Sequence, residues 1–191
     1  MSNVFEVDKY TYSKDENYLF DANIWLKLFS PYTFEDQKLN DIYTRMLRNI
    51  LSINGSIYTN NMIVSEVVNQ ISQTEYKFCR NYYEKDDPVL KDFTHKRFRE
   101  TEHYKEEVSF FISCQIRKIA DISKLCDVNA DATELLYNIA DIFEECKLDY
   151  NDIIHLKTCE EKKLTLITHD SDFKDCGIKV ITANKAMHET N

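Results

Sequence analysis

Four acidic side chains stand where apolar segments of this chain meet turns or helix starts. Asp21 follows the apolar run Tyr18-Leu19-Phe20, and Asp170 comes just after a run of aliphatic residues. Glu66 and Asp152 lie near the starts of segments with helical spacing. Carboxylates held close together bind divalent cations, and such ions can activate water for attack on a phosphodiester. The first hypothesis is therefore metal-assisted phosphodiester hydrolysis.

The elements around these acids alternate between two kinds. β-branched and aliphatic residues predict short strands at 17–21, 56–59, 164–168 and 178–182, with a brief strand near 126–128. Helical spacing predicts helices between them, and Gly55 is expected to cap the one that begins at Thr33. Residues 1–16 are expected to form a polar lead-in, and 76–125 a charged helical region broken near Pro88. Alternation of this kind predicts an α/β fold with a parallel sheet covered on both faces.

This arrangement brings the four acids to one edge of the sheet. In right-handed β-α-β units the helices run antiparallel to the strands, so each helix begins where strands end. Asp21 and Asp170 would lie at strand ends, and Glu66 and Asp152 in the first turns of helices at that edge. Further acids that could join them are Asp172, Asp149 and Asp131.

Carboxylates that converge repel one another. Two unit charges about 4 Å apart interact by roughly 4 kcal/mol at an effective dielectric constant near 20. Some of the acids must then be protonated, or a cation must lie among them. All-oxygen ligands favour Mg²⁺ or Mn²⁺ over zinc. The alternative is that Asp21, Asp152 and Asp170 only cap turns and helices, which leaves Glu66 among apolar neighbours unexplained.

Composition excludes several other classes of function. With two glycines, the 191-residue chain has neither a phosphate-binding P-loop nor a dinucleotide-binding turn. The formal net charge of −9 argues against a general nucleic-acid coat protein. Six scattered cysteines and a polar N-terminus predict reduced thiols in a cytoplasmic protein. No apolar run is long enough to predict a membrane helix.

Four blocks around the acids resemble the motifs of PIN-domain nucleases, the family that includes VapC-type toxins. Leu19-Phe20-Asp21-Ala22-Asn23 resembles the first strand of the family with its D-x-N motif. Val64-Ser65-Glu66-Val67-Val68-Asn69 resembles its helix glutamate, and Tyr150-Asn151-Asp152-Ile153-Ile154-His155 resembles its third acid. Leu166-Ile167-Thr168-His169-Asp170-Ser171-Asp172-Phe173 resembles its T-x-D-x-D-F ending, the most specific block. The likeness covers about 18–75 and 118–183.

The resemblance implies a three-layer α/β/α fold with about four to five parallel strands, in a single domain over 1–191. It also implies Mg²⁺- or Mn²⁺-dependent cleavage of RNA by Asp21, Glu66, Asp152 and Asp170, with support from Asn23 and Asp172. An inhibitory partner such as an antitoxin, and a homodimer, are expected on the same ground. Residues 76–117 have no counterpart in compact family members and are predicted to be a helical insertion.

A basic stretch with aromatic residues and a histidine near the acids each allow a functional and a structural interpretation. Lys96, Arg97 and Arg99 lie beside Phe93, Phe98 and Tyr104, a pattern that suits phosphate contacts and base stacking on single-stranded RNA. Interspersed glutamates also allow a solvated helix face. His155, three residues after Asp152, either reaches the acids or packs in the core, and His169 is expected to point away from Asp170.

Three functions remain open from the sequence. The first is a metal-dependent endoribonuclease. The second is a catalytically silent scaffold or interaction protein in an RNA-processing or defence assembly, which the complete set of four acids disfavours. The third is a phosphohydrolase acting on small esters, which would show D-x-D after its first strand, whereas residue 23 is Asn.

Overall fold

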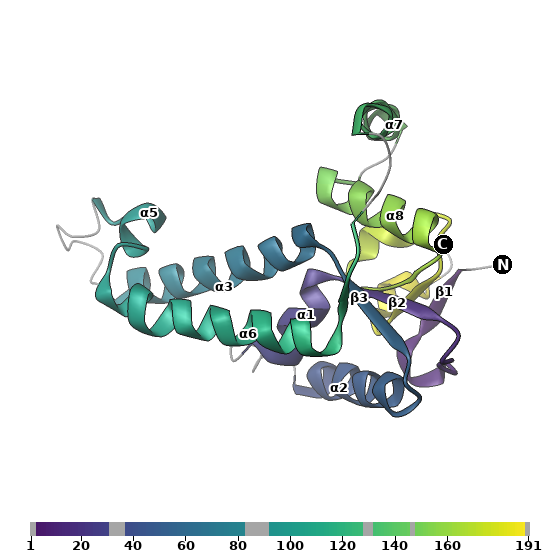
Figure 1. Cartoon of the computed structure of the whole chain (residues 1–191), viewed down its shortest axis with the longest axis horizontal. Coiled ribbons are helices and arrows are strands. Elements are labelled where there is room, and N and C mark those ends of the chain that lie inside the picture. Colours follow the sequence, from purple (N-terminus) through teal and green to yellow (C-terminus); the bar gives the residue numbers. More distant parts are fainter. Residues whose placement is uncertain (1–2, 31–36, 83–91, 128–131, 146–147, 190–191) are drawn as a thin grey trace.

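The computed structural model describes residues 3–30, 37–82, 92–127, 132–145 and 148–189. In this part of the chain a parallel sheet of six strands has the order β1-β6-β5-β2-β3-β4 (Figure 1). The strands are β1 (Val4–Glu6), β2 (Asn17–Phe20), β3 (Ser56–Thr59), β4 (Lys124–Leu125), β5 (Thr165–Ile167) and β6 (Val180–Thr182). The predicted parallel α/β fold is confirmed.

Two edge strands differ from the sequence-based expectation. Strand β1 lies in the segment predicted to be a lead-in, where Val4 pairs with Val180 of β6. Strand β4 ends at Leu125, just before the brief strand predicted at 126–128. Edge strands have a neighbour on one side only and can be short, so their sequences carry a weak apolar pattern. The sheet therefore has six strands rather than four to five.

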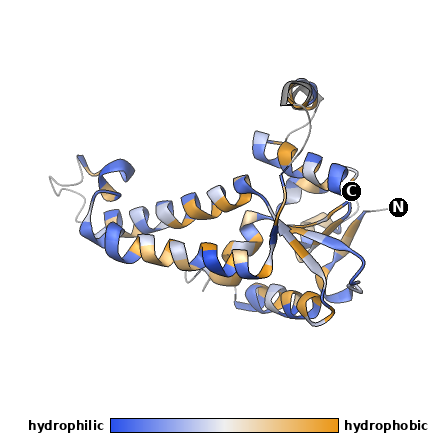
Figure 2. Ribbon diagram, viewed as in Figure 1, coloured by the Kyte–Doolittle hydropathy of each residue, from blue (hydrophilic) through white to orange (hydrophobic). Residues whose placement is uncertain are grey.

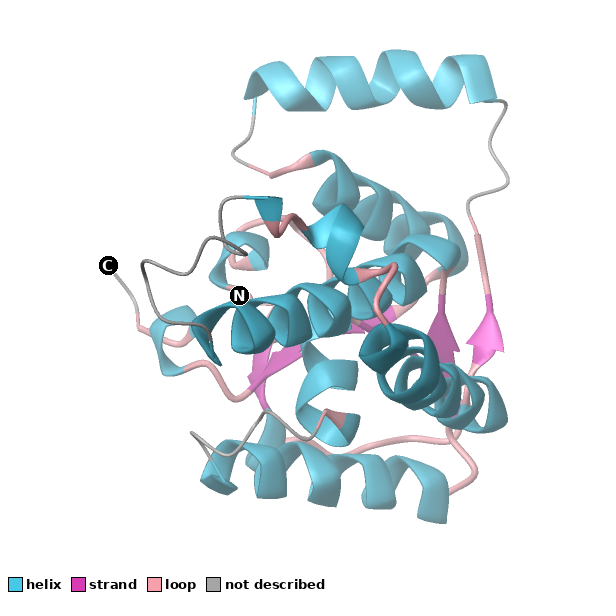
Figure 3. Ribbon diagram, turned by 90° about the vertical axis from the view of Figure 1, so that its left-hand side faces the viewer, coloured by secondary structure: helices cyan, strands magenta, loops and turns pink. Residues whose placement is uncertain are grey.

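Helices cover both faces of this sheet. They are α1 (Ala22–Phe29), α2 (Gln37–Ser52), α3 (Asn61–Tyr82), α5 (His95–Phe98), α6 (Ser109–Ile122), α7 (Ala132–Glu145) and α8 (Tyr150–Lys162), with a π-helix η3 (Tyr104–Val108) before α6. Helix α8 lies over one face and α2 over the other, while α1 contacts α2 and α3 (Figures 1 and 3). Helix α7 packs against α8. The result is a three-layer α/β/α arrangement.

Helices α3 and α6 run side by side and extend away from the sheet as a helical arm, with α5 near its outer end (Figure 1). Helix α3 passes through residue 76 without interruption, so the predicted insertion at 76–117 does not begin at a break. Pro88, the predicted break, lies outside the described residues. Buried residues of the arm, such as Phe98 and Ile112, belong to the same hydrophobic cluster as the sheet.

Burial explains why these segments form their elements. All residues of β5 are buried, as are Tyr18, Leu19 and Phe20 of β2, because helices cover both faces of the central strands. Helix α2 instead carries hydrophobic and hydrophilic residues in turn along its ribbon (Figure 2) and buries Tyr43, Met46, Leu47 and Ile50 against the core, whereas Leu51 is 41% exposed. In the α7 region, Leu136, expected to face inward, is 56% exposed.

The end of α2 corrects the predicted cap at Gly55. The residue in the left-handed conformation is Asn54, with φ of 56°, because Asn tolerates this region better than other side chains do. Gly55 is needed for space, since a Cβ there would lie 2.9 Å from Cγ2 of Ile50. The start of this helix, predicted at Thr33, lies outside the described residues.

In the part of the chain that the structure describes, no helix has the length and apolar character needed to cross a bilayer.

Candidate active site

Asp21 stands at the carboxyl end of the central strand β2 and caps helix α1. Its backbone N–H donates to the carbonyl of Ile167 on β5, 3.0 Å away, which fixes it between the two strand ends. The residue is 6% exposed. An extended backbone at Asp21 turns directly into helix α1, so strand and helix together hold the carboxylate at the sheet edge.

Three donors hold the carboxylate of Asp21. Oδ1 accepts from the backbone N–H of Ala22, and Oδ2 accepts from Nδ2 of Asn23 and Oγ1 of Thr168, each at 2.6 Å. Burial raises the pKa of Asp21 above its ordinary value, while these hydrogen bonds oppose that rise. The charge of Asp170 raises it further. Asn23, predicted to support the site, therefore contacts Asp21 directly.

The loop after β5 is tied to this centre through Thr168. Its Oγ1 accepts from Nδ2 of Asn23 and from the backbone N–H of Asp170, both at 3.0 Å. The backbone N–H of His169 donates to Oδ1 of Asn23 at 3.0 Å. These bonds join the segment after β2 to the segment after β5, so the position of Asp170 depends on Asn23 and Thr168.

Glu66 reaches the same edge from helix α3, which begins directly after β3. Oδ1 of Asn60 accepts from the backbone N–H of Ile63 at 2.8 Å and so caps this helix. The carboxylate of Glu66 is half-buried, and this burial is the main cause that raises its pKa. The charges of Asp21, Asp149 and Asp170 raise it further, which places Glu66 within electrostatic reach of all three.

Asp152 reaches the edge from helix α8, where it forms a capping box with Asp149. Oδ1 of Asp149 accepts from the N–H of Asp152 at 2.9 Å, and Oδ2 of Asp152 accepts from the N–H of Asp149 at 3.2 Å. Burial first, and then the charges of Asp149, Asp170 and Asp21, raise the pKa of Asp152 to about 7. Asp152 therefore both caps helix α8 and lies in the group of acids.

The four predicted acids therefore converge, and Asp149 joins them. Among the described residues, none of Asp21, Glu66, Asp152 and Asp170 forms an ion pair with a lysine, arginine or histidine. Three of them, Asp21, Glu66 and Asp152, have pKa values raised by burial and by the charges of neighbouring acids. An all-oxygen set with uncompensated charge has the donor chemistry that Mg²⁺ or Mn²⁺ requires. Among the described residues, no three of these carboxylates place one oxygen each within 4.8 Å of the others, so the fit rests on donor chemistry and charge.

The other acids named from the sequence have different places. Asp172 is exposed, and its backbone N–H donates to Oδ1 of Asp170 at 3.0 Å. It thus braces the loop through its main chain. Asp131 lies outside the described residues.

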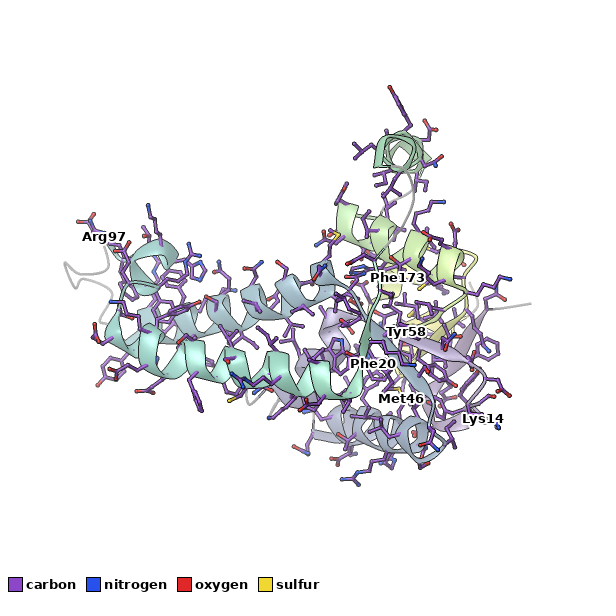
Figure 4. All side chains as sticks on the ribbon, viewed as in Figure 1. Lys14, Phe20, Met46, Tyr58, Arg97 and Phe173 are labelled. Carbon is purple, nitrogen blue, oxygen red and sulfur yellow. The ribbon has the colours of Figure 1, made fainter. Side chains whose placement is uncertain are left out.

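The predicted RNA-contact residues lie far from this edge. Arg97 stands at the outer end of the arm, whereas Phe20, the neighbour of Asp21, lies at the sheet (Figure 4). Lys96 and Arg99 are exposed, and Arg97 forms an ion pair with Asp92 at 3.8 Å. RNA that touched both regions would have to run along the arm.

Of the aromatic side chains considered for base stacking, Phe98 is buried in a cluster of rings. Phe98 is 1% exposed and forms ring contacts with Tyr76, Phe93 and Tyr104. Phe93 and Tyr104 are half-buried in this cluster. Burial of apolar rings stabilises the outer end of the arm, so they serve the fold there.

Both histidines near the acids have structural surroundings. His155 is 1% exposed, its Nδ1 lies 3.4 Å from Nδ2 of Asn60, and burial lowers its pKa to about 4, so it stays neutral. Its Nε2 has no hydrogen-bond partner among the described residues. Nδ1 of His169 lies 3.0 Å from the hydroxyl of Tyr43 on α2.

Sequence reasoning missed the supporting roles of Thr168, Tyr43 and Asn184. The hydroxyl of Tyr43 accepts from the N–H of Ala183, and Nδ2 of Asn184 donates to the carbonyl of His169 at 2.9 Å. In the sequence Tyr43 fits the apolar spacing of its helix, which conceals this role. A buried tyrosine usually pairs its hydroxyl, which was the one available signal.

Comparison with known proteins agrees with this geometry. The family model described as the PIN domain matches residues 18–179, which is most of the chain. The chain belongs to the PIN-domain family. PIN domains are generally nucleases, so membership supports a hydrolase that cleaves nucleic acid. No curated protein matches the chain in sequence.

Two solved structures are similar to this PIN protein. The crystal structure of VapBC2 from Rickettsia felis, bound to a DNA fragment from their promoter, has a TM-score of 0.53 and 14% identity, and covers 87% of this chain and 98% of that chain. This likeness supports the fold. The crystal structure of PAE2754 from Pyrobaculum aerophilum has a TM-score of 0.47 and 13% identity, and covers 93% of this chain and 96% of that chain.

Proposed function

We propose that this PIN protein is a divalent-metal-dependent endoribonuclease in which Asp21, Glu66, Asp152 and Asp170 hold Mg²⁺ or Mn²⁺. The observation that supports the proposal is that burial and the charges of neighbouring acids raise the pKa of Asp21, Glu66 and Asp152 at the carboxyl edge of the sheet, where no cationic side chain of the described residues pairs with them. Such uncompensated charge costs stability unless a cation binds.

The side chains have different tasks in this proposal. Asp21 is the most rigid ligand, since Asn23, Thr168 and the N–H of Ala22 fix both of its oxygens. Asp152 would hold the ion as a charged carboxylate, because a nearby cation favours that form over the protonated one. The bound ion would supply Lewis acidity, lowering the pKa of a water and neutralising charge on the phosphate. Asp172 remains a further candidate ligand.

The partner and setting are part of the same proposal. Similarity to the VapBC2 structure supports a toxin of a toxin–antitoxin pair, held inactive in the cytoplasm by an antitoxin or other inhibitory protein. A homodimer is proposed with it. Expression in a bacterial host tests the toxin role: the wild-type chain should arrest growth, and a variant without cleavage activity should not.

The activity is tested by incubating the purified protein with a mixed RNA pool and Mn²⁺, and sequencing the products. Cleavage should depend on Mn²⁺, stop on chelation, and leave a matched DNA pool intact. Asp170→Asn should abolish it, whereas Asp175→Asn, an exposed neighbour with the same charge change, should not. A folded protein that cleaves no RNA with any divalent ion would overturn the proposal in favour of a scaffold.

A further inference from the structure

A second group of potential metal ligands lies in the outer part of the arm. Glu75 and Cys79 are four residues apart on α3 and so share a face of that helix. His103 approaches them from the segment just before the π-helix η3. One ligand atom from each of the three lies within 4.8 Å of the others. At about 1.5 Å per residue, Cys79 is roughly 20 Å along the helix axis from Glu66, so this cluster is separate from the acidic edge.

The imidazole of His103 has a carboxylate at each ring nitrogen. Its Nε2 lies 3.7 Å from Oε2 of Glu75, and its Nδ1 lies 3.4 Å from Oε2 of Glu107. A neutral imidazole carries one N–H, so one nitrogen would direct its lone pair toward a carboxylate oxygen. The lone pair of Nε2 and the carboxylate of Glu75 would then repel each other, and a cation bound between them removes this repulsion. Glu107 then accepts the Nδ1–H, the arrangement typical of a histidine bound to zinc.

The donor set identifies the metal by its chemistry. A thiolate, an imidazole nitrogen and a carboxylate oxygen together suit Zn²⁺, whereas Mg²⁺ and Mn²⁺ prefer oxygen ligands alone. Ligand atoms about 2.0–2.3 Å from a tetrahedral zinc lie roughly 3.3–3.8 Å from one another. The 3.7 Å between Nε2 of His103 and Oε2 of Glu75 is slightly longer than the roughly 3.3–3.5 Å of a nitrogen–oxygen pair on such a zinc, so a small side-chain shift would complete the geometry. Water would take the fourth position.

We propose that Glu75, Cys79 and His103 form a zinc site, with Glu107 positioning His103, that fastens α3 to the segment entering α6. Exposed His103 and half-buried Glu75 and Cys79 leave the site open to the ion from solvent. The ring of His103 also lies 6.2 Å from that of buried Phe98, in α5. Zinc bound here would therefore hold the outer end of the arm, with its exposed basic residues, in one orientation.

Binding at this site includes a proton balance. Burial and the charge of Glu75 raise the pKa of the Cys79 thiol, so the metal-free cluster holds the proton. Zinc binds the thiolate, and the thiol proton passes to solvent. Affinity should therefore increase with pH.

Cobalt tests the proposal, because Co²⁺ bound to a thiolate has a charge-transfer absorption band in the near ultraviolet. The wild-type protein should show this band with one equivalent of Co²⁺ and lose it when Zn²⁺ is added. Cys79→Ser should abolish the band, whereas Cys126→Ser, which changes another half-buried thiol, should keep it. Glu107→Gln should keep the band but weaken affinity about 10- to 100-fold.

Two further variants keep the result interpretable. His103→Gln changes a side chain that is 41% exposed, so folding should survive while metal affinity falls at least about 10-fold. Asp21→Asn should retain the cobalt band, which separates this site from the proposed nuclease centre. A band that persists in Cys79→Ser, disappears in Cys126→Ser, or is absent from the wild-type protein would overturn the proposal.

Discussion

The substitution Asp21→Asn should have a small effect on the stability of the metal-free protein and a large effect on the proposed metal binding. The carboxylate accepts three hydrogen bonds of 2.6 Å, two of them at Oδ2. An amide oxygen in the Oδ2 position keeps the bonds from Asn23 and Thr168. The amide NH₂ then faces the N–H of Ala22, which loses its acceptor at a cost of about 1–3 kcal/mol.

A compensating gain comes from the lost charge. Burial and the charge of Asp170 raise the pKa of Asp21, so its charged form is disfavoured in the folded protein at pH 7. The neutral amide removes this penalty. The metal-free Asp21→Asn protein should therefore differ from wild type by no more than about 2 kcal/mol in the free energy of unfolding.

The metal-dependent results should differ much more. An ion that binds only the native state stabilises it by about 2.7 kcal/mol at a concentration 100 times its Kd. Mn²⁺ should stabilise the wild-type protein in this way and give Asp21→Asn little or no stabilisation. The rate of RNA cleavage should fall at least about 100-fold, as it does when one stabilising group is removed from an active site.

Urea denaturation with and without Mn²⁺, together with RNA cleavage, measures both effects. Asp121→Asn is the matched control, because it removes an equal charge from an exposed position on α6. Equal cleavage by Asp21→Asn and wild type, or equal stabilisation by Mn²⁺, would refute the proposed metal role. A metal-free loss well above 2 kcal/mol would show that relief of charge does not offset the lost hydrogen bond.

Three further predictions concern pH, the loop after β5 and the arm. The pKa of Asp152 is raised from 3.8 to about 7, so the native state binds more protons than the unfolded state between these pH values. Without metal, the free energy of unfolding should therefore fall by about 1–2 kcal/mol as the pH rises from about 4 to 7, a figure reduced because the side chain is half-exposed. Denaturation of Asp152→Asn should depend less on pH over the same range. Thr168→Val removes the hydroxyl that donates to the buried carboxylate of Asp21 and accepts from two partly buried N–H groups, and should cost about 2–3 kcal/mol in denaturation, whereas Thr168→Ser should recover most of it. Replacing Lys96, Arg97 and Arg99 with Gln should weaken RNA binding and reduce the log–log salt slope by about 2 in filter binding, and an unchanged slope would exclude contact there.

The placement of the four acids in the fold was more predictable than the elements at the edges of the sheet. The acids follow or begin strongly patterned segments, and the handedness of β-α-β connections then places them at one edge. Strand β1 has no such pattern, since pairing with β6 on one side fixes it. The sequence does not show which basic and aromatic residues of the arm are buried and which are exposed. Tertiary packing decides this, since it buries Phe98 and leaves the adjacent Arg99 exposed.

The parallel α/β fold and the four blocks that carry Asp21, Glu66, Asp152 and Asp170 can be inferred from the chain, because local apolar periodicity and the handedness of its connections suffice for both. The neighbours that hold these carboxylates, and the burial that raises the pKa of Asp21, Glu66 and Asp152, follow from the folded structure alone. The same is true of the approach of His103 to Cys79. Such contacts depend on how distant elements pack, and no local pattern encodes the distance between two side chains that meet only after folding.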